Sequence, residues 1–279
     1  MCLAAVTQFC GTNDISKNLK ICIDLINDAS QKGAKMIFFP EASDFTAINN
    51  EEALSLTSSI ENLQFIEEIK NSAKKNNIWV SIGVHENSHL PSRIYNSHVL
   101  ITSSGTLIQP IYHKLHLFDI SIQDGPQFME SSYVLKGENI IDPVETPVGK
   151  VGMMVCYDLR FPELSLELRK RGADVLTYPA AFTLKTGMAH WEVLLRARAI
   201  ETQTYVIASA HIGKQNENRT SFGSAMIVDP WGTILARCPE TTQPSFALAE
   251  INLDRLKNIR IGMPVLEHRR TDLFGESSK

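Results

Sequence analysis

The fold follows from residues 151–163, which read VGMMVCYDLRFPE. The stretch opens as an apolar run, the pattern of a buried strand. Pro162 and Glu163 are typical of a first helical turn, because that turn tolerates proline and its dipole favours a carboxylate. Cys156 stands between strand and helix, where a nucleophile would be lifted out of the sheet beside backbone N–H groups. A buried, unreactive cysteine fits the same position.

The length and composition fit one α/β unit. The 279 residues are enough for one large domain or two small ones, and 43% of them are apolar, enough for a full core. No linker or break in composition divides the chain. We therefore predict a single domain over residues 1–279, with a short C-terminal tail from about residue 253.

Charge and hydropathy exclude two classes of partner. The formal net charge of −4 gives no basic surface for nucleic acid or an anionic membrane. No apolar run approaches the roughly 20 residues that a membrane-spanning helix needs. The opening residues, MCLAAV, lead straight into a strand pattern without room for a signal or transit peptide. The five cysteines form no CxxC pair, which argues against a disulfide framework and for a cytoplasmic location.

The apolar periodicity alternates between strand and helix patterns, and antiparallel hairpins are added later. It predicts strands at 3–9, 34–39, 78–84, 151–155, 174–179, 205–210 and 246–251, helices at 15–29, 60–75, 163–171 and 188–202, and hairpins at 97–112 and 224–237. This order is typical of an α/β protein with one or two mixed sheets covered by helices.

Two polar residues stand where such folds place their sites. Glu41 comes just after the predicted strand 34–39, at the carboxyl end where α/β folds hold ligands. A solvated loop glutamate would look the same. Lys114 lies in the run YHKLHLFD among aromatic and aliphatic residues. There it is either a stem that snorkels to the surface or a partly desolvated catalytic cation.

A long segment without periodicity, residues 119–147, carries Glu130. Such a loop inside a compact domain is often functional. The nearby His113 and His116 have no third ligand at a recognisable spacing, so we predict that they are structural and that the chain holds no metal.

The set Glu41, Lys114, Glu130 and Cys156 resembles that of the nitrilase superfamily of carbon–nitrogen hydrolases. The strings that carry the resemblance are FFPEA at 38–42, HKLHLFD at 113–119, CYDLRFPE at 156–163, AHWEVLLRARA at 189–199 and DPWG at 229–232. Within the superfamily, the chain is most similar to the deaminated glutathione amidase branch, through residues 161–165, 197–203 and 219–223. The neighbouring ω-amidase branch shares the core strings.

The resemblance implies a four-layer α-β-β-α sandwich, a homodimer or larger homo-oligomer, and no cofactor. It also implies roles for the site residues. Cys156 would attack an amide carbonyl and form a thioester, with Glu41 as general base. Lys114 and the N–H of Tyr157 would stabilise the oxyanion, and Glu130 would orient Lys114 or pass a proton to the leaving amine.

The implied substrate is a small carboxylate-bearing amide, deaminated glutathione, cleaved to 2-oxoglutarate and cysteinylglycine. We therefore name Tyr157, Arg160, Phe182 and Thr186 as candidate substrate-binding residues, with Arg160 as a bidentate clamp for a carboxylate. A salt bridge from Arg160 to Asp158 or Glu163 would explain the arginine equally well.

Three other functions stay open at this point. The first is an ω-amidase that releases ammonia from 2-oxoglutaramate or 2-oxosuccinamate. The second is a papain-like hydrolase with His190 or His211 as its base. The third is a catalytically silent binding module that retains the fold.

Overall fold

The computed structural model describes residues 2–121 and 127–274. Its strands are β1 (Cys2–Phe9), β2 (Met36–Phe38), β3 (Trp79–Asn87), β4 (Ile94–Ile101), β5 (Tyr112–His113), β6 (Asp119–Ser121), β7 (Gln127–Met129), β8 (Val134–Leu135), β9 (Val144–Thr146), β10 (Gly149–Met153), β11 (Val175–Thr177), β12 (Tyr205–Ala208), β13 (Ala210–Lys214), β14 (Thr220–Phe222), β15 (Met226–Val228), β16 (Ile234–Arg237) and β17 (Ser245–Ile251). Its α-helices are α1 (Ile15–Gln31), α2 (Asn50–Thr57), α3 (Ile60–Asn76), α4 (Pro162–Lys170), α5 (Leu184–Thr186), α6 (Glu192–Thr202), α7 (Leu253–Gly262) and α8 (Thr271–Phe274).

Most of these strands belong to two mixed sheets. The first has the order β14-β13-β1-β2-β3-β4-β5, with β17 also paired to β1 and β8 to β4. Its strands β1, β2 and β3 are parallel, and β17 runs antiparallel along almost the whole of β1. The second sheet has the order β16-β15-β12-β11-β10-β9, with β10, β11 and β12 parallel.

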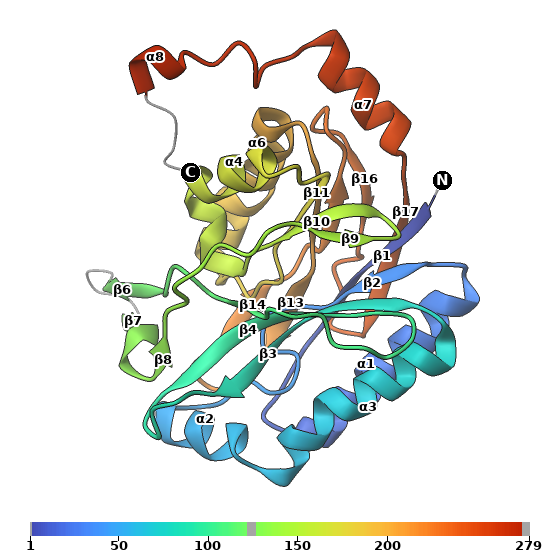
Figure 1. Cartoon of the computed structure of the whole chain (residues 1–279). Helices are drawn as coiled ribbons and strands as arrows, with labels where there is room; N and C mark the ends of the chain where they lie inside the picture. Colours follow the sequence, from blue (N-terminus) through green and yellow to red (C-terminus); the bar gives the residue numbers. More distant parts are fainter. Residues whose placement is uncertain (1, 122–126, 275–279) are drawn as a thin grey trace.

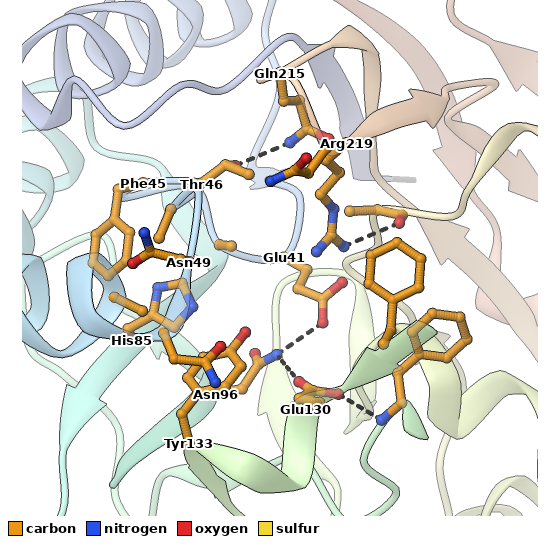
Figure 2. Close-up of a pocket in the computed structure, with 18 of the residues that line it drawn as sticks. Glu41, Phe45, Thr46, Asn49, His85, Asn96, Glu130, Tyr133, Gln215 and Arg219 are labelled. Carbon is orange, nitrogen blue, oxygen red and sulfur yellow. Dashed lines mark hydrogen bonds between the residues drawn. The ribbon is translucent and has the colours of Figure 1, made fainter. Parts of the chain in front are cut away.

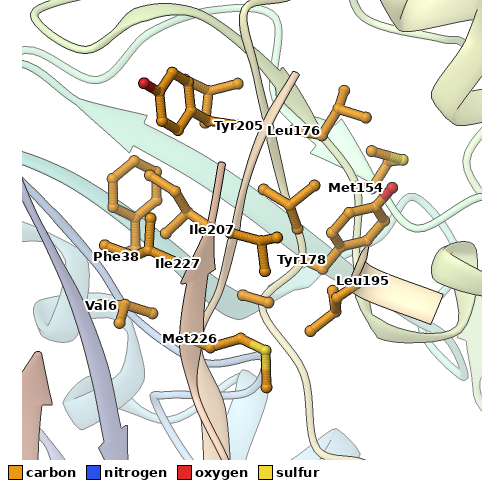
Figure 3. Packing of buried hydrophobic residues seen from close by; sticks show 14 of the residues in the cluster. Val6, Phe38, Met154, Leu176, Tyr178, Leu195, Tyr205, Ile207, Met226 and Ile227 are labelled. Carbon is orange, nitrogen blue, oxygen red and sulfur yellow. The ribbon is translucent and has the colours of Figure 1, made fainter. Parts of the chain in front are cut away.

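The two sheets face each other, and helices cover their outer faces (Figure 1). Helices α1 and α3 cover the first sheet, and α4 and α6 cover the second. Between the sheets lies a continuous apolar core, in which Val6 and Phe38 of the first sheet pack with Ile207 and Ile227 of the second (Figure 3). This is the four-layer α-β-β-α sandwich that the resemblance predicts.

Local sequence explains the helix that opens the chain. The Asp14 side chain caps α1 by accepting a hydrogen bond from the Lys17 N–H at 2.9 Å. Cys22 and Ile26, on the apolar face of α1, are fully buried against the first sheet. Cys22 is therefore a core residue.

The hairpin predicted at 97–112 is present, and its first arm also pairs with a second strand that the prediction did not include. One edge of β4 pairs along its whole length with β3. Along the other edge the predicted second arm runs antiparallel, through a bridge from Leu107 to Ile101 and through the two-residue β5. Pro110 interrupts that arm, and proline has no N–H to donate to a ladder.

Two helical segments also differ from the prediction. Helix α2 carries few apolar residues, so its periodicity gave no signal. The helix predicted at 188–202 begins instead as a π-helical turn at Gly187–Trp191, and α6 starts at Glu192. Across residues 2–121 and 127–274, no helix combines the length and apolarity required to cross a bilayer.

Candidate active site

Cys156 lies at a sharp turn after β10, which is the neighbour of the edge strand β9 in the second sheet. Strand β10 ends at Met153, and a 3-10 turn over Cys156–Arg160 precedes α4, so the strand-to-helix turn predicted there has one additional short element. Cys156 has a φ of 47°, a conformation that costs energy in a residue with a side chain. Its N–H donates to the carbonyl of Pro179 at 2.9 Å, which fixes the turn against the neighbouring strand connection.

Asp158 holds this turn from inside. Its fully buried carboxylate accepts hydrogen bonds from the Val155 N–H at 2.8 Å, from the Tyr112 hydroxyl at 2.6 Å and from the His116 N–H at 3.0 Å. The ring nitrogen Nδ1 of His116 lies 2.7 Å from the same carboxylate. Asp158 thus ties the nucleophile's turn to the end of the first sheet, and His116 has the structural position expected of it.

Lys114 joins two glutamates that are far apart in the sequence. These two, Glu41 and Glu130, lie near each other in Figure 2. Its Nζ donates to Glu41 Oε1 at 2.9 Å and to both oxygens of Glu130, at 3.1 and 2.9 Å. Glu41 and Lys114 are 3% and 2% exposed, so this is a desolvated ion cluster and not a surface pair. The backbone N–H of Phe118 donates to Glu130 Oε2 at 2.6 Å and fixes the second glutamate.

Asn96 also belongs to this cluster, although the sequence did not predict it as a site residue. Its Nδ2 donates to Glu41 Oε1 at 2.8 Å and to Glu130 Oε1 at 3.0 Å. The only signal in the sequence is a run of polar residues, Asn96 to His98, inside a strand that begins and ends with apolar residues. Asn96 keeps the two carboxylates at a fixed separation around the ammonium.

The charges of the cluster set the ionisation of its members. Burial opposes ionisation of Glu41, but the Lys114 and Arg219 cations outweigh it and lower the pKa of Glu41 to about 2. Burial would lower the pKa of Lys114, but Glu130 and Glu41 raise it well above its usual value. Burial raises the pKa of the Cys156 thiol, and Glu41 raises it further, against the opposing effect of Lys114. The resting site therefore holds a carboxylate, an ammonium and a neutral thiol.

One carboxylate oxygen of Glu41 is free to accept a proton. Its Oε2 is buried and, among the described residues, has no hydrogen-bond partner. Glu41 and Cys156 line the same cavity, and the carboxylate contributes to the raised pKa of the thiol. An ionised carboxylate with an unused oxygen beside a protonated thiol is the arrangement that a general base requires.

All four residues of the predicted set open into one cavity of about 900 Å³. Tyr157 and Phe182, two of the predicted substrate-binding residues, also line it. The first turns of α2 and the segment 215–219 form other parts of its wall. The cavity extends well beyond the nucleophile, and its size is ordinary for a small-molecule site.

Arg160 and Thr186 are not among the described residues that line this cavity. The Arg160 guanidinium lies over the rings of Tyr157 and Phe182, 5.9 and 5.5 Å from their centroids, and 3.3 Å from His190 Nδ1. It makes no salt bridge to Asp158 or Glu163 in the part of the chain that the structure describes. The Thr186 hydroxyl lies 2.9 Å from that of Thr183, a residue that lines the cavity.

Arg219 is a cationic residue of the cavity that was not among the predicted site residues. It stands within the segment 219–223 that carried the family resemblance, but nothing in the sequence places that segment beside Cys156. In Figure 2 it lies on the opposite side of Glu41 from Glu130.

The histidines of the papain-like alternative point elsewhere. His211 is fully buried, with Nε2 2.7 Å from the carbonyl of Glu41 and Nδ1 3.0 Å from that of Phe9. His190 contacts Arg160, outside the cavity. His211 thus supports the backbone of Glu41. In residues 2–121 and 127–274, no three His, Cys, Asp or Glu side chains gather in a way that could hold a metal ion.

Comparison with known proteins agrees with this geometry. Residues 3–261 match the family model described as carbon-nitrogen hydrolase. The chain is 49% identical over 275 residues to the probable hydrolase nit2 of Schizosaccharomyces pombe, a match that covers 98% of this chain and 99% of that protein. It is 46% identical over 277 residues to the deaminated glutathione amidase of Homo sapiens, covering 98% of this chain and 84% of that protein.

A solved structure shows the same fold. The NitFhit protein of Caenorhabditis elegans superposes with a TM-score of 0.92 at 43% identity, over 98% of this chain and 66% of that one. The resemblance drawn from the motifs and the fold expected from it are both confirmed. Because the family model and these relatives span nearly the whole sequence, the chain belongs to the carbon–nitrogen hydrolase family.

Proposed function

We propose that this chain is an amidase that hydrolyses the amide bond of deaminated glutathione, releasing 2-oxoglutarate and cysteinylglycine. The observation that carries the chemistry is the meeting of Cys156 with the buried Glu41–Lys114–Glu130 cluster in one cavity. The substrate is the one named for the human relative, which is 46% identical over 277 residues.

Acylation begins with the neutral thiol. Cys156 Sγ attacks the amide carbonyl carbon while its proton passes to Glu41, so that no free thiolate has to exist beforehand. The carbonyl oxygen becomes an oxyanion, stabilised by Lys114 Nζ and the Tyr157 N–H; one such donor typically contributes about 3–4 kcal/mol to the transition state. Glu41 returns the proton to the nitrogen, the C–N bond breaks, the amine leaves and a thioester remains.

Deacylation reverses these roles. Glu41 takes a proton from a water molecule, whose oxygen attacks the thioester carbonyl, and the second oxyanion occupies the same donors. When the C–S bond breaks, Glu41 returns the proton to the departing sulfur of Cys156. The acid leaves and the starting state is restored. Glu130 holds the ammonium of Lys114 in place through both steps.

The size of the cavity favours a substrate with a bulky leaving group. An ω-amide such as 2-oxoglutaramate releases only ammonia, so its cleavage needs little space on the amine side. Here the cavity reaches from Cys156 to the first turn of α2 and to Phe128 and Met129, a volume suited to a dipeptide amine.

A direct test compares both substrates on the purified protein. We expect kcat/KM for deaminated glutathione to exceed that for 2-oxoglutaramate, with 2-oxoglutarate measured as the common product. Cys156→Ala should abolish turnover of both, while Cys10→Ala, at a half-buried cysteine outside the cavity, should leave it unchanged. A preference for 2-oxoglutaramate would replace our assignment with an ω-amidase, and normal turnover by Cys156→Ala would remove the mechanism.

We further propose that the chain works as a homodimer or larger homo-oligomer. Supporting this, the outer face of the second sheet's helical layer presents Met188, Val193 and Ile200, which are 76%, 67% and 47% exposed. Light scattering on the purified protein should give at least twice the monomer mass. Val193→Glu should reduce that mass if the surface is an interface.

A further inference from the structure

We propose that Arg219 binds a carboxylate of the amide substrate and is thereby a specificity-determining residue of this enzyme. The inference rests on the function proposed above and names a recognition element within that site.

The first argument is the pairing of charges in the cavity. Lys114, His85 and Arg219 are the lining residues that can carry positive charge. Lys114 is paired with two glutamates, and His85 Nδ1 lies 3.0 Å from the buried carboxylate of Asp44. Within the described residues, no carboxylate lies within salt-bridge distance of Arg219. The cation without a counter-charge is the one that an anionic ligand would neutralise.

The second argument is the set of unused donors on Arg219. One guanidinium nitrogen, Nη2, donates to the carbonyl of Ala181 at 3.2 Å. The Nε atom is buried, and the described residues provide it with no hydrogen-bond partner. A buried donor without an acceptor is destabilising. A guanidinium presents its donors as a planar fork, and a carboxylate matches that fork with two parallel hydrogen bonds.

The third argument is the position of Arg219 relative to the reacting atoms. The residue that accepts its hydrogen bond, Ala181, also presents its backbone N–H to the Cys156 thiol. Arg219 is near enough to Glu41 to contribute to the low pKa of that carboxyl. A carboxylate bound to Arg219 would thus lie a few bonds from the scissile carbonyl, a separation found on both sides of the amide of deaminated glutathione.

The loop that carries Arg219 is held in place before any ligand arrives. Its carbonyl accepts the Gln215 N–H at 2.9 Å, and the neighbouring Asn216 side chain donates to the carbonyl of Ala47 at 3.1 Å. These bonds fix the segment against residue Ala47, which also lines the cavity. A preformed cation loses little entropy on binding, so it contributes more to affinity than a mobile one.

The simplest competing role for Arg219 is to tune Glu41 without touching the substrate. That role predicts a defect that is the same for every substrate, because the ionisation of Glu41 does not depend on which amide is bound. Carboxylate binding predicts a defect that disappears when the bound carboxylate is removed from the substrate. The two roles are therefore separable by substrate chemistry.

The experiment measures kcat and KM for Arg219→Gln, Arg219→Lys and wild type on three amides. These are deaminated glutathione, its C-terminal glycinamide form, and butanoyl-cysteinylglycine, which lacks the acyl-side carboxylate and keto group. Lys214→Gln is the matched control, because Lys214 is an exposed cation on the same hairpin that does not line the cavity. Thermal unfolding of each variant checks that the fold is intact.

On deaminated glutathione we expect Arg219→Gln to raise KM roughly 10- to 100-fold, the usual loss for a hydrogen bond to a charged group. Arg219→Lys should recover part of the loss, since it keeps the charge without the fork. If the defect vanishes on the glycinamide form, Arg219 binds the leaving-group carboxylate. If it vanishes on the butanoyl substrate, Arg219 binds the acyl-side carboxylate.

An equal defect on all three amides, or a defect confined to kcat, would overturn the proposal in favour of the tuning role. Unchanged KM in Arg219→Gln would overturn it outright. Failure of the underlying function looks different, because the wild type itself would then not cleave deaminated glutathione. Binding of 2-oxoglutarate and of cysteinylglycine to the Cys156→Ala protein, with and without Arg219→Gln, provides a readout that needs no turnover.

Discussion

Replacing Gly83 with alanine should displace the general base without touching any polar group of the site. Gly83 lies in β3 beside the segment that carries Glu41. A Cβ added there would stand 2.6 Å from Glu41 Cα and 2.8 Å from the carbonyl oxygen of Pro40. Ordinary contact begins at 3.4 Å, so the two backbones would have to separate by about 0.8 Å (3.4 minus 2.6).

That separation is opposed by the hydrogen bonds between the same segments. The Gly83 N–H donates to Pro40 at 3.1 Å, and its carbonyl accepts the Ser43 N–H at 2.8 Å. Overpacking of this kind costs about 1–3 kcal/mol of stability. A displacement approaching 1 Å at a catalytic carboxylate costs on the order of 100-fold in rate. We therefore expect both effects in Gly83→Ala, with the larger consequence in kcat.

The assay is steady-state hydrolysis of deaminated glutathione, combined with urea unfolding monitored by fluorescence. Gly262→Ala is the control, because a Cβ at that position meets nothing within 4 Å. A Gly83→Ala protein with wild-type kcat would refute the claim that the position of Glu41 limits catalysis. An unchanged free energy of unfolding would refute the claim that the two segments cannot separate freely.

Three further outcomes follow from buried polar contacts. His98 is buried, and this lowers its pKa from 6.5 to about 4, so the unfolded chain takes up a proton at higher pH than the folded one. The free energy of unfolding should then fall by about 3 kcal/mol as the pH drops from 6.5 to 4, and His98→Gln should remove most of that dependence in urea titrations. Tyr112→Phe leaves Asp158 without its 2.6 Å donor and should cost about 1.5–3 kcal/mol of stability in the same assay. Asn96→Ala removes the donor shared by Glu41 and Glu130 and should lower kcat on deaminated glutathione by about 10-fold or more, while Asn96→Asp, which adds a third carboxylate, should lower it further.

The sequence is most informative where a local pattern has one interpretation. The apolar run before Cys156 and the proline after it predict a strand, a turn and a helix, and the structure has them in that order, with a 3-10 turn inserted. Glu41 is likewise found just past a buried strand. The prediction of two stacked sheets rested on the family resemblance. The alternation of strands and helices along the sequence does not distinguish one mixed sheet from two.

The rest of the site depends on contacts between distant segments. Asn96 reaches Glu41 and Glu130 only because β4 pairs with β3, a pairing that lies outside the hairpin expected at 97–112. Arg219 faces the cavity only because its loop packs against Ala47 and Ala181. Arg160 was named as a clamp from its spacing to Cys156, and its guanidinium lies over Tyr157 and Phe182, two residues of the cavity wall, without itself being among the described lining residues. Spacing along the chain does not encode which way such a side chain turns.

The pairing of β17 with β1 also bears on how the protein is made. During synthesis on a ribosome, β1 emerges first, and the strand that covers one of its edges emerges more than two hundred residues later. Until then that edge is an apolar, unpaired template on which another nascent chain could add a strand. Closure of the first sheet is consequently a late, long-range event, which predicts slow folding and a need for protection from aggregation until residue 251 has left the exit tunnel.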